Sequence, residues 1–198
     1  MKYEFVPGDE KVIAPGRTIK RIRALVAIAA FGVSAGDLGG YIESERNLSQ
    51  VSGNAWVSGD AQVSGNARVS GNAQVSGNAR VSGNAQVSGD AWVSGNAQVS
   101  GDAWVSGDAQ VSGDARVSGN AQVSGDGLIV WFSNVGSENG TLTAYNAKDN
   151  EIEVTRGCFK GSIDEFLAAS KKKHDDQTHL EYRLLIEVAH SRITRARK

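Results

Sequence analysis

The chain has one cysteine and two prolines among its 198 residues. A single cysteine, Cys158, excludes a disulfide framework and any zinc site that needs several cysteines, and it fits a reducing cytoplasm. Scarce proline together with 24 glycines favours a turn-rich regular fold over a proline-rich disordered linker. The 21 basic and 22 acidic residues leave a net charge of −1, so neither a nucleic-acid nor a membrane partner is expected.

Long hydrophobic runs are also missing, since no apolar run reaches the roughly 18 residues of a membrane span. Residues 20–35, KRIRALVAIAAFGVSA, place basic residues before apolar and then small ones, which imitates a secretion signal. This run follows the charged segment 1–19. A buried strand or short helix at the base of the fold is therefore the favoured interpretation.

What the chain does have is a six-residue word, V-S-G-[N/D]-A-x. Twelve complete hexads run from Val51 to Gln122, and a thirteenth breaks the word at Gly127. Within a hexad, Ala and the next Val are two residues apart and share one face of an extended strand, while x lies on the other. Ser-Gly-Asn/Asp forms the corner, because Gly accepts positive φ and Asn or Asp bonds nearby backbone.

The word resembles the hexapeptide signature of left-handed parallel β-helices, over residues 51–126 without a break. In that family three hexads close a triangular coil, which implies four coils here, roughly 20 Å tall by strand spacing. The expected fold is mainly β: a left-handed parallel β-helix over 51–126, an N-terminal β cap over 1–50 and a C-terminal α+β cap over 127–198. Stability is then largely a sum over neighbouring coils.

The variable letter alternates, with Gln in every second hexad. Because a coil holds three hexads, the alternation inverts from one rung to the next. The expected stacks are Trp56–Gln74–Trp92–Gln110, Gln62–Arg80–Gln98–Arg116 and Arg68–Gln86–Trp104–Gln122. In this checkerboard equal charges lie two rungs apart, where exposed repulsion is weak. Duplication of a unit of two hexads explains the same pattern.

The outward Trp and Arg residues are the candidate binding residues, because exposed aromatics often anchor interfaces. The set is Trp56, Trp92, Trp104, Arg80 and Arg116. Trp56 and Trp92 are expected about 10 Å apart on one face. Either a cap covers that face, or the exposed Trp residues form a surface for a protein partner or for self-association.

One corner column is expected to collect aspartates. It runs Asn54, Asn72, Asp90, Asp108 and Asp126. Three aspartates at rung spacing repel one another, which raises some of their pKa values or favours a weak cation site at Asp90, Asp108 and Asp126. Solvated corners are the favoured interpretation, and no metal or cofactor is expected.

The N-terminal cap is expected to hold two strands, KYEFV and TIKRIRAL, separated by the turn-rich PGDEKVIAPG. GDLGGYIES at 36–44 predicts an irregular first coil. Its glycines lack the Gly-Lys-Ser/Thr and the following helix of a phosphate-binding loop.

In the C-terminal cap, Asn139-Gly140 suits a type I′ turn, and the strands TLTAYNA and EIEVTRG follow around the turn KDN. Ser162 and Glu165 form a capping box for a helix over 163–173. A second helix is expected over 178–194. Its basic tail, RITRARK, suits a helix C-terminus better than a phosphate site.

Three motifs outside the repeat carry a second resemblance: GDLGGYIE at 36–43, GSENGTLTAY at 136–145 and VTRGCFKGSIDEF at 154–166. The layout resembles a group of small phage and prophage proteins of poorly defined role. The stretch RALVAIAAFGV departs from the shorter, more polar segment of that group. The resemblance implies a viral protein in the cytoplasm of a bacterial host, without an agreed chemistry.

Left-handed β-helices include acyltransferases with a catalytic His at a subunit interface, and zinc carbonic anhydrases with several coil His ligands. The coils here contain no His and no inserted loop, and His174, His179 and His190 lie in the expected C-terminal helices. A general base must reach the group it deprotonates, so no enzymatic activity is expected. Cys158 is expected to be a small buried core residue, with a Cys–His nucleophile pair as the alternative.

The first functional hypothesis is a non-enzymatic phage-type β-helix protein acting through protein contact. It would be a structural or assembly component, or an inhibitor of a host bacterial system. The alternatives are a binder of a small nucleotide-like molecule at a subunit or cap–helix crevice, an engineered or consensus solenoid, and a degenerate acyltransferase. Co-purifying small molecules would favour the first alternative, and acyl-CoA binding the last.

Overall fold

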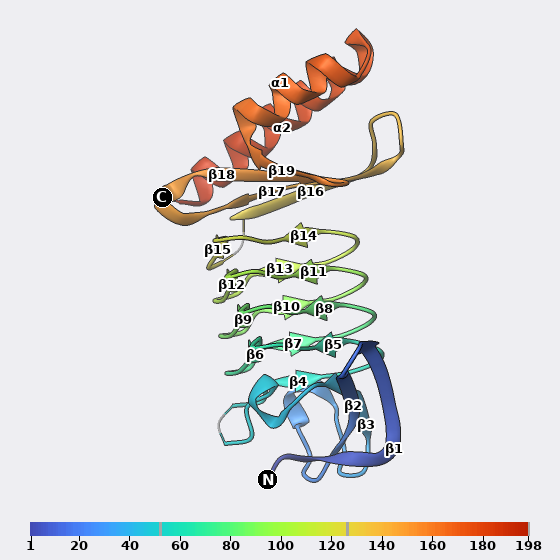
Figure 1. Cartoon of the computed structure of the whole chain (residues 1–198). Coiled ribbons are helices and arrows are strands. Elements are labelled where there is room, and N and C mark those ends of the chain that lie inside the picture. Colours follow the sequence, from blue (N-terminus) through green and yellow to red (C-terminus); the bar gives the residue numbers. More distant parts are fainter. Residues whose placement is uncertain (52, 126, 198) are drawn as a thin grey trace.

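A computed structural model describes residues 1–51, 53–125 and 127–197. It is mainly β, with a stack of parallel coils between two caps (Figure 1). The N-terminal cap lies at one end of the stack, and the sheet and helices of the C-terminal cap lie at the other. The predicted fold class of a parallel β-helix with three hexads per coil is confirmed.

Twelve two-residue strands build the regular coils, and each consists of the variable letter and the following Val. They are β4 (Trp56–Val57), β5 (Gln62–Val63), β6 (Arg68–Val69), β7 (Gln74–Val75), β8 (Arg80–Val81), β9 (Gln86–Val87), β10 (Trp92–Val93), β11 (Gln98–Val99), β12 (Trp104–Val105), β13 (Gln110–Val111), β14 (Arg116–Val117) and β15 (Gln122–Val123). Each pairs in parallel with the strand three hexads away, as Trp92 does with Gln74 and with Gln110. The pairing produces three flat faces, in the orders β4-β7-β10-β13, β5-β8-β11-β14 and β6-β9-β12-β15.

Side-chain size and backbone conformation explain why the word closes into a coil. Every Ala and Val of the coil interior from Ala55 to Val123 is at most 1% exposed. Fully burying a Val side chain contributes roughly 1.5–3 kcal/mol, and only a stacked neighbour provides that burial. The corner Gly77 has φ of 68°, and a Cβ there would lie 3.0 Å from the carbonyl oxygen of Gly95. Glycine is thus required both for the turn and for the close approach of successive corners.

The N-terminal cap extends one face of the coil. Its elements are β1 (Tyr3–Ala14), β2 (Arg17–Ala24), the short helix η1 (Ala29–Phe31), β3 (Leu38–Ile42) and the short helix η2 (Glu45–Asn47). Strands β1, β2 and β3 pair antiparallel, and β3 pairs in parallel with β5. Tyr41 pairs with Gln62, 21 residues away instead of the 18 of the regular coils, so the segment 36–44 starts an irregular first coil as the sequence predicted. The bridge between Leu48 and Val69 has the same wider spacing. With four regular rungs the molecule has about five coils.

Two expectations for the N-terminal cap need correction. The segment PGDEKVIAPG does not separate two strands, because β1 runs through it with a register shift and turns only at Pro15 and Gly16. The run 20–35 is part strand and part short helix as expected, but it is only partly buried. Ile22 and Ile28 are core residues, whereas Leu25 and Val26 are exposed.

The C-terminal cap is a four-stranded antiparallel sheet followed by two helices. Its elements are β16 (Ile129–Val135), β17 (Gly140–Asn146), the short helix η3 (Lys148–Asn150), β18 (Ile152–Arg156), β19 (Phe159–Ser162), α1 (Ile163–Lys173) and α2 (Asp176–Ala196). The helix over 163–173 and its capping box are confirmed. None of the described helices is long and apolar enough to cross a membrane.

Two boundaries in this cap differ from prediction. The β16–β17 turn is a four-residue loop over 136–139, in which Gly136 and Asn139 have positive φ and Gly140 does not, so it is not a type I′ turn at Asn139-Gly140. Helix α2 begins two residues before the predicted 178, because the Asp175 carboxylate accepts a 2.7 Å hydrogen bond from the Thr178 amide and caps it.

Polar side chains of the C-terminal sheet close the upper edge of the coil. The hydroxyl of Thr155 donates to the Arg116 carbonyl at 3.0 Å, and the Asn146 amide donates to the Gln122 carbonyl at 2.9 Å. The Tyr145 hydroxyl donates to the Ser118 carbonyl at 3.2 Å, and burial raises the pKa of Tyr145 to about 12. These bonds satisfy strand groups that would otherwise invite pairing with another chain.

Candidate functional site

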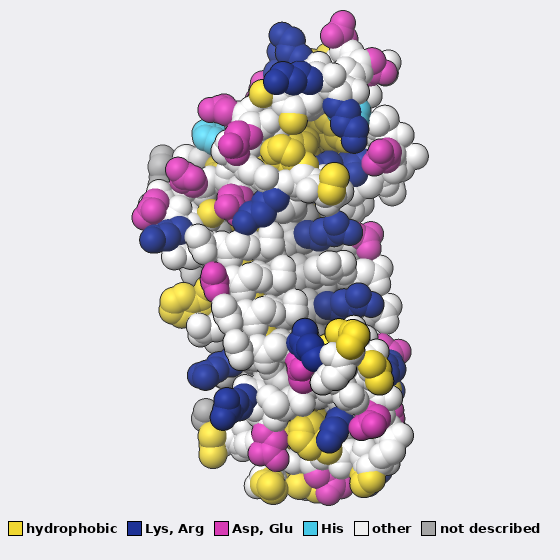
Figure 2. Space-filling view, viewed as in Figure 1, with side chains coloured by type: hydrophobic (Ala, Val, Ile, Leu, Met, Phe, Trp, Pro, Cys, Tyr) yellow, Lys and Arg dark blue, Asp and Glu magenta, His cyan; other side chains and the backbone are white. Residues whose placement is uncertain are grey.

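The outward side chains at the variable position of the hexad stack as the sequence predicted. Pairing places Trp56, Gln74, Trp92 and Gln110 on one face in that order. The other two stacks, with their Arg residues and Trp104, also agree residue by residue. The outside of the coil therefore alternates long amides with Trp or Arg. Figure 2 shows charged side chains gathered mainly on the two caps, with a largely uncharged coil between them.

Trp56 is not available for binding. Its side chain is 1% exposed and belongs to the core that the N-terminal cap forms with the first coils. A Cβ at Gly39 of β3 would lie 2.8 Å from the Trp56 ring, so only glycine lets the ring fit there. The interpretation that a cap covers the face of Trp56 and Trp92 is thus correct for Trp56 and wrong for Trp92. The expectation that Trp56 belongs to an exposed binding surface is wrong.

Trp92 and Trp104 remain on the surface. Their side chains are 45% and 52% exposed, and both belong to the same coil, in β10 and β12. The indole N–H of Trp92 donates to the Ser76 hydroxyl at 3.0 Å, which holds the ring against the rung below. The two rings lie on different faces of the triangle, so they do not form one flat patch.

The two candidate arginines have different surroundings. Arg116 is tied to the C-terminal cap, because its guanidinium donates to the Gly157 carbonyl at 2.9 Å. Arg80 is exposed on the middle of the same face, and among the described residues it forms no ion pair. Of the two, Arg80 is therefore the cation that a partner on that face can reach.

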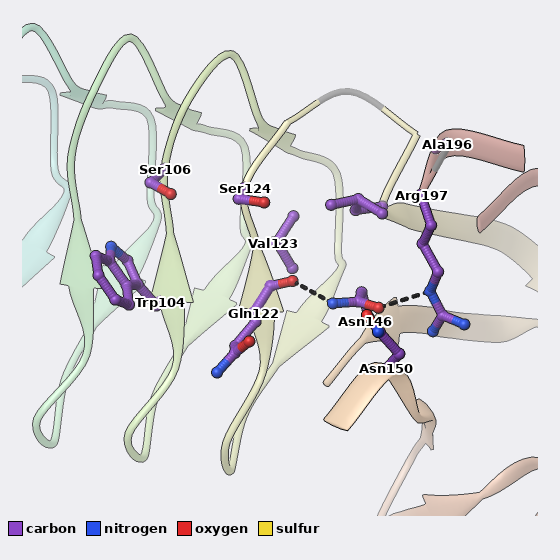
Figure 3. Close-up of a pocket in the computed structure, with 10 residues that line it drawn as sticks. Trp104, Ser106, Gln122, Val123, Ser124, Asn146, Asn150, Ala196 and Arg197 are labelled. Carbon is purple, nitrogen blue, oxygen red and sulfur yellow. Dashed lines mark hydrogen bonds between the residues drawn. The ribbon is translucent and has the colours of Figure 1, made fainter. Parts of the chain in front are cut away.

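A pocket of about 420 Å³ adjoins Trp104 where the coil meets the C-terminal cap. Figure 3 shows Trp104 at one end and Arg197 at the other, with Gln122 and Asn146 between them. The Arg197 guanidinium donates to the Asn146 side-chain oxygen at 2.8 Å and to the Glu151 carbonyl at 3.1 Å. The end of the basic tail thus anchors α2 to the sheet, and the pocket extends the Trp104 surface into a groove.

The predicted acidic corner starts as a hydrogen-bonded ladder. The Asn54 side-chain amide donates to the Asn72 side-chain oxygen, and the Asn72 amide donates to the Asp90 carboxylate at 3.0 Å. Asp126 lies outside the described residues, and within the described chain no group of three or more His, Cys, Asp or Glu side chains could hold a metal ion.

The expectation that Cys158 is buried is wrong. Cys158 is exposed, in the two-residue turn between β18 and β19, where Gly157 has φ of 60°. Gly at the first position of a two-residue hairpin loop is typical of a type II′ turn, so the run R-G-C-F contained this signal.

Folding brings Cys158 and His174 to one pocket of about 360 Å³, which the sequence did not reveal. The His174 ring contacts the Ser137 hydroxyl at 3.3 Å, and the His179 ring contacts the Ser170 hydroxyl at 3.2 Å. His190 is exposed on α2. None of these side chains is hydrogen-bonded to Cys158 in the described chain, so a thiol–imidazole pair is not formed.

Comparison with known families gives one match, confined to the coil. Five overlapping segments match the model of the YdcK beta solenoid repeat: residues 61–77, 73–89, 85–101, 97–111 and 109–125. Successive matches begin two hexads apart. No curated protein matches the chain. Both caps lie outside the matched segments, and over its coil the chain is similar to the YdcK beta solenoid repeat.

Proposed function

We propose that this protein is a non-enzymatic, phage- or prophage-type β-helix protein that acts by binding another protein through the flank of the coil that carries Trp92 and Trp104. The exposure of these two Trp side chains, 45% and 52%, is the observation that carries the proposal. The remaining outward letters are Gln and Arg, and the corners are Ser, Gly, Asn and Asp. Trp and Arg are the residues most enriched at the energetic centres of interfaces.

Rigidity supports the same proposal. Trp92 is held by its bond to Ser76, and the coil beneath both rings is closed by regular strand pairing. A side chain that is already fixed loses little conformational entropy on binding. The groove beside Trp104 offers a partner side chain a place to insert.

The partner is a host bacterial protein or a second copy of the chain, and the setting is the cytoplasm of a bacterial host. The protein would then be an assembly component or an inhibitor of a host system. The motifs GDLGGYIE and VTRGCFKGSIDEF, with their resemblance to phage and prophage proteins, support this origin. The absence of His from residues 51–126 argues against the degenerate acyltransferase.

The test replaces Trp92 and Trp104 together by Gln, the residue above and below each in its stack. Light scattering measures self-association, and affinity capture from host lysate measures a foreign partner. We expect the double variant to lose the associated species or the captured protein while its circular dichroism and melting temperature stay close to the parent's. The matched control is Gln98→Ser, which changes an outward residue on the face that carries neither Trp92 nor Trp104. Association or capture that survives in the double variant would refute the proposal.

A further inference from the structure

The C-terminal cap contains a second pocket, which the protein-contact function does not use. It has a volume of about 360 Å³ and lies between the end of the β-sheet and the two helices. Phe159 of β19, Phe166 of α1 and Tyr182 of α2 contribute its aromatic lining. Their rings meet edge to face, with centroids 5.3 Å apart for Phe159 and Phe166 and 5.2 Å apart for Phe166 and Tyr182. The volume is within the range of roughly 300–1,000 Å³ typical of small-molecule sites.

The pocket lining contains two cations, Arg156 and Lys173, together with His174. Glu138 is the one acidic residue in its described lining. The Arg156 guanidinium lies 6.0 Å from the Tyr182 ring centroid, and the His174 and Tyr182 rings are 5.6 Å apart, edge to face. On the face shown in Figure 2, hydrophobic side chains of this cap have basic side chains beside them.

Arg156 is incompletely satisfied. One terminal nitrogen donates to the Val135 carbonyl at 3.0 Å, but the Nε is buried without a hydrogen-bond partner. It is the one side-chain nitrogen or oxygen in this condition among the described residues. No described carboxylate forms an ion pair with Arg156. A buried donor of a charged group without an acceptor is costly, and such a group often marks the place of a bound ligand or ion.

From this combination we infer that the cap pocket binds a small anion carried on a flat apolar ring. The ligand ring packs against the half-buried Phe159, which rests on the buried rings of Phe166 and Tyr182. The carboxylate or phosphate accepts a hydrogen bond from a terminal nitrogen of the Arg156 guanidinium, and Lys173 lines the same pocket as a second cation. Guanidinium groups bind carboxylates and phosphates through paired, charge-assisted hydrogen bonds. An aryl carboxylate and a mononucleotide share this chemistry.

The test uses the full chain and two charged probes, 1-naphthoate and adenosine 5′-monophosphate. Their neutral counterparts are 1-naphthalenemethanol and adenosine. We expect calorimetry to give at least one charged probe an affinity about 10-fold or more above that of its counterpart, the usual effect of a hydrogen bond to a charged group. The probe that binds distinguishes a carboxylate ligand from a nucleotide.

Arg156→Gln is expected to abolish this preference, and Lys173→Gln to weaken binding several-fold. Lys172→Gln is the matched control, because it removes the same charge from the same helix at a position that does not line the pocket. If Arg156→Gln does not fold, Lys173→Gln carries the test.

Cys158 provides an independent readout, because it is the one cysteine of the chain, is exposed and lines the pocket. A saturating charged probe should slow its alkylation by iodoacetamide, and the neutral counterpart at the same concentration should not. Equal affinity for charged and neutral probes, no binding at millimolar concentration, or binding that leaves both alkylation and the Lys173 variant unaffected would each overturn the inference.

Discussion

Trp56 and Trp92 occupy the same face and the same place in the hexad, two rungs apart, yet they have opposite environments. Trp56 is 1% exposed and Trp92 is 45% exposed. Each is stacked against Gln74, so replacing either by Gln introduces a residue that the coil already accepts beside it. Comparing the two substitutions therefore isolates what the N-terminal cap contributes to the free energy of unfolding.

Trp56→Gln removes a fully buried ring from beneath β3 and places an amide in an apolar site. Loss of a buried Trp costs about 3–5 kcal/mol, and an unpaired buried amide adds to that cost. At about 2–4 °C per kcal/mol for a chain of this size, the melting temperature should fall by roughly 6–20 °C. Trp92→Gln loses one hydrogen bond to Ser76 and a half-exposed ring, so its cost should be about 0–1 kcal/mol.

Thermal unfolding followed by circular dichroism measures the difference, and amide hydrogen exchange locates it. Because coils interact mainly with their neighbours, exchange should accelerate in residues 1–50 and in the first coil, while β13, β14 and β15 stay protected. Equal melting temperatures for the two variants would refute the placement of Trp56 beneath the cap. Acceleration at the C-terminal coils alone would refute the nearest-neighbour account.

Three further predictions concern single positions. Hydrogen bonds from Arg17 and a backbone amide lower the pKa of Glu43 to about 2. The ionised carboxylate should therefore stabilise the fold fully above pH 4.5, and this stabilisation should disappear as the pH falls towards 2. In Glu43→Gln the melting temperature should depend less on pH between 4.5 and 2. Gly77→Ala should cost about 1–3 kcal/mol in urea unfolding, because φ is 68° and the added Cβ meets backbone at 3.0 Å. Asp90→Asn should stabilise by about 0.5–1 kcal/mol, since its amide would donate to Asp108 as Asn72 now donates to Asp90.

Each of these variants has a control in the same chain. Glu10→Gln removes an exposed acid and should leave the pH profile unchanged. Gly157→Ala has a similar φ of 60° but nothing within 4 Å of the added Cβ, so it should cost less than Gly77→Ala. Asp114→Asn lies in the last described rung of its column and gains no acceptor above it. If a control variant changes stability or its pH dependence as much as the variant it is matched to, the explanation given for that variant would be contradicted.

The coil was predictable from sequence because every determinant is local and repeated. Ala55 and Val57 illustrate it: two residues apart, both small enough for the interior, and followed by a glycine that turns the chain. The same spacing predicted which outward letters meet, and all three stacks agree with the pairing. The helix after Ser162 was equally readable, since both members of its capping box lie in the first turn.

The errors arose where the outcome depends on contacts distant in sequence. The hexads of Trp56 and Trp92 differ only in a corner residue, Asn54 or Asp90, which does not predict burial. The difference in exposure comes from Gly39, which precedes the whole repeat and lets β3 cover the Trp56 ring. The cap pocket joins Cys158, His174 and Tyr182 from a turn, a helix end and a second helix, and no local pattern predicts such a meeting. The exposure of Cys158 could have been predicted from the sequence, because the preceding Gly157 indicates a hairpin turn.

The strict pairing of every third hexad also has a consequence for how the length of the molecule can change. Adding or removing a single hexad would rotate the C-terminal cap by one face relative to the N-terminal cap, whereas three hexads would translate it by about 4.8 Å and leave its orientation intact. The alternation of Gln repeats after two hexads, so only steps of six hexads, the separation of Trp56 and Trp92, preserve both the orientation of the cap and the rungs on which each face carries Gln. Descendants of this chain with longer or shorter spacers between the same two ends should therefore differ by whole turns.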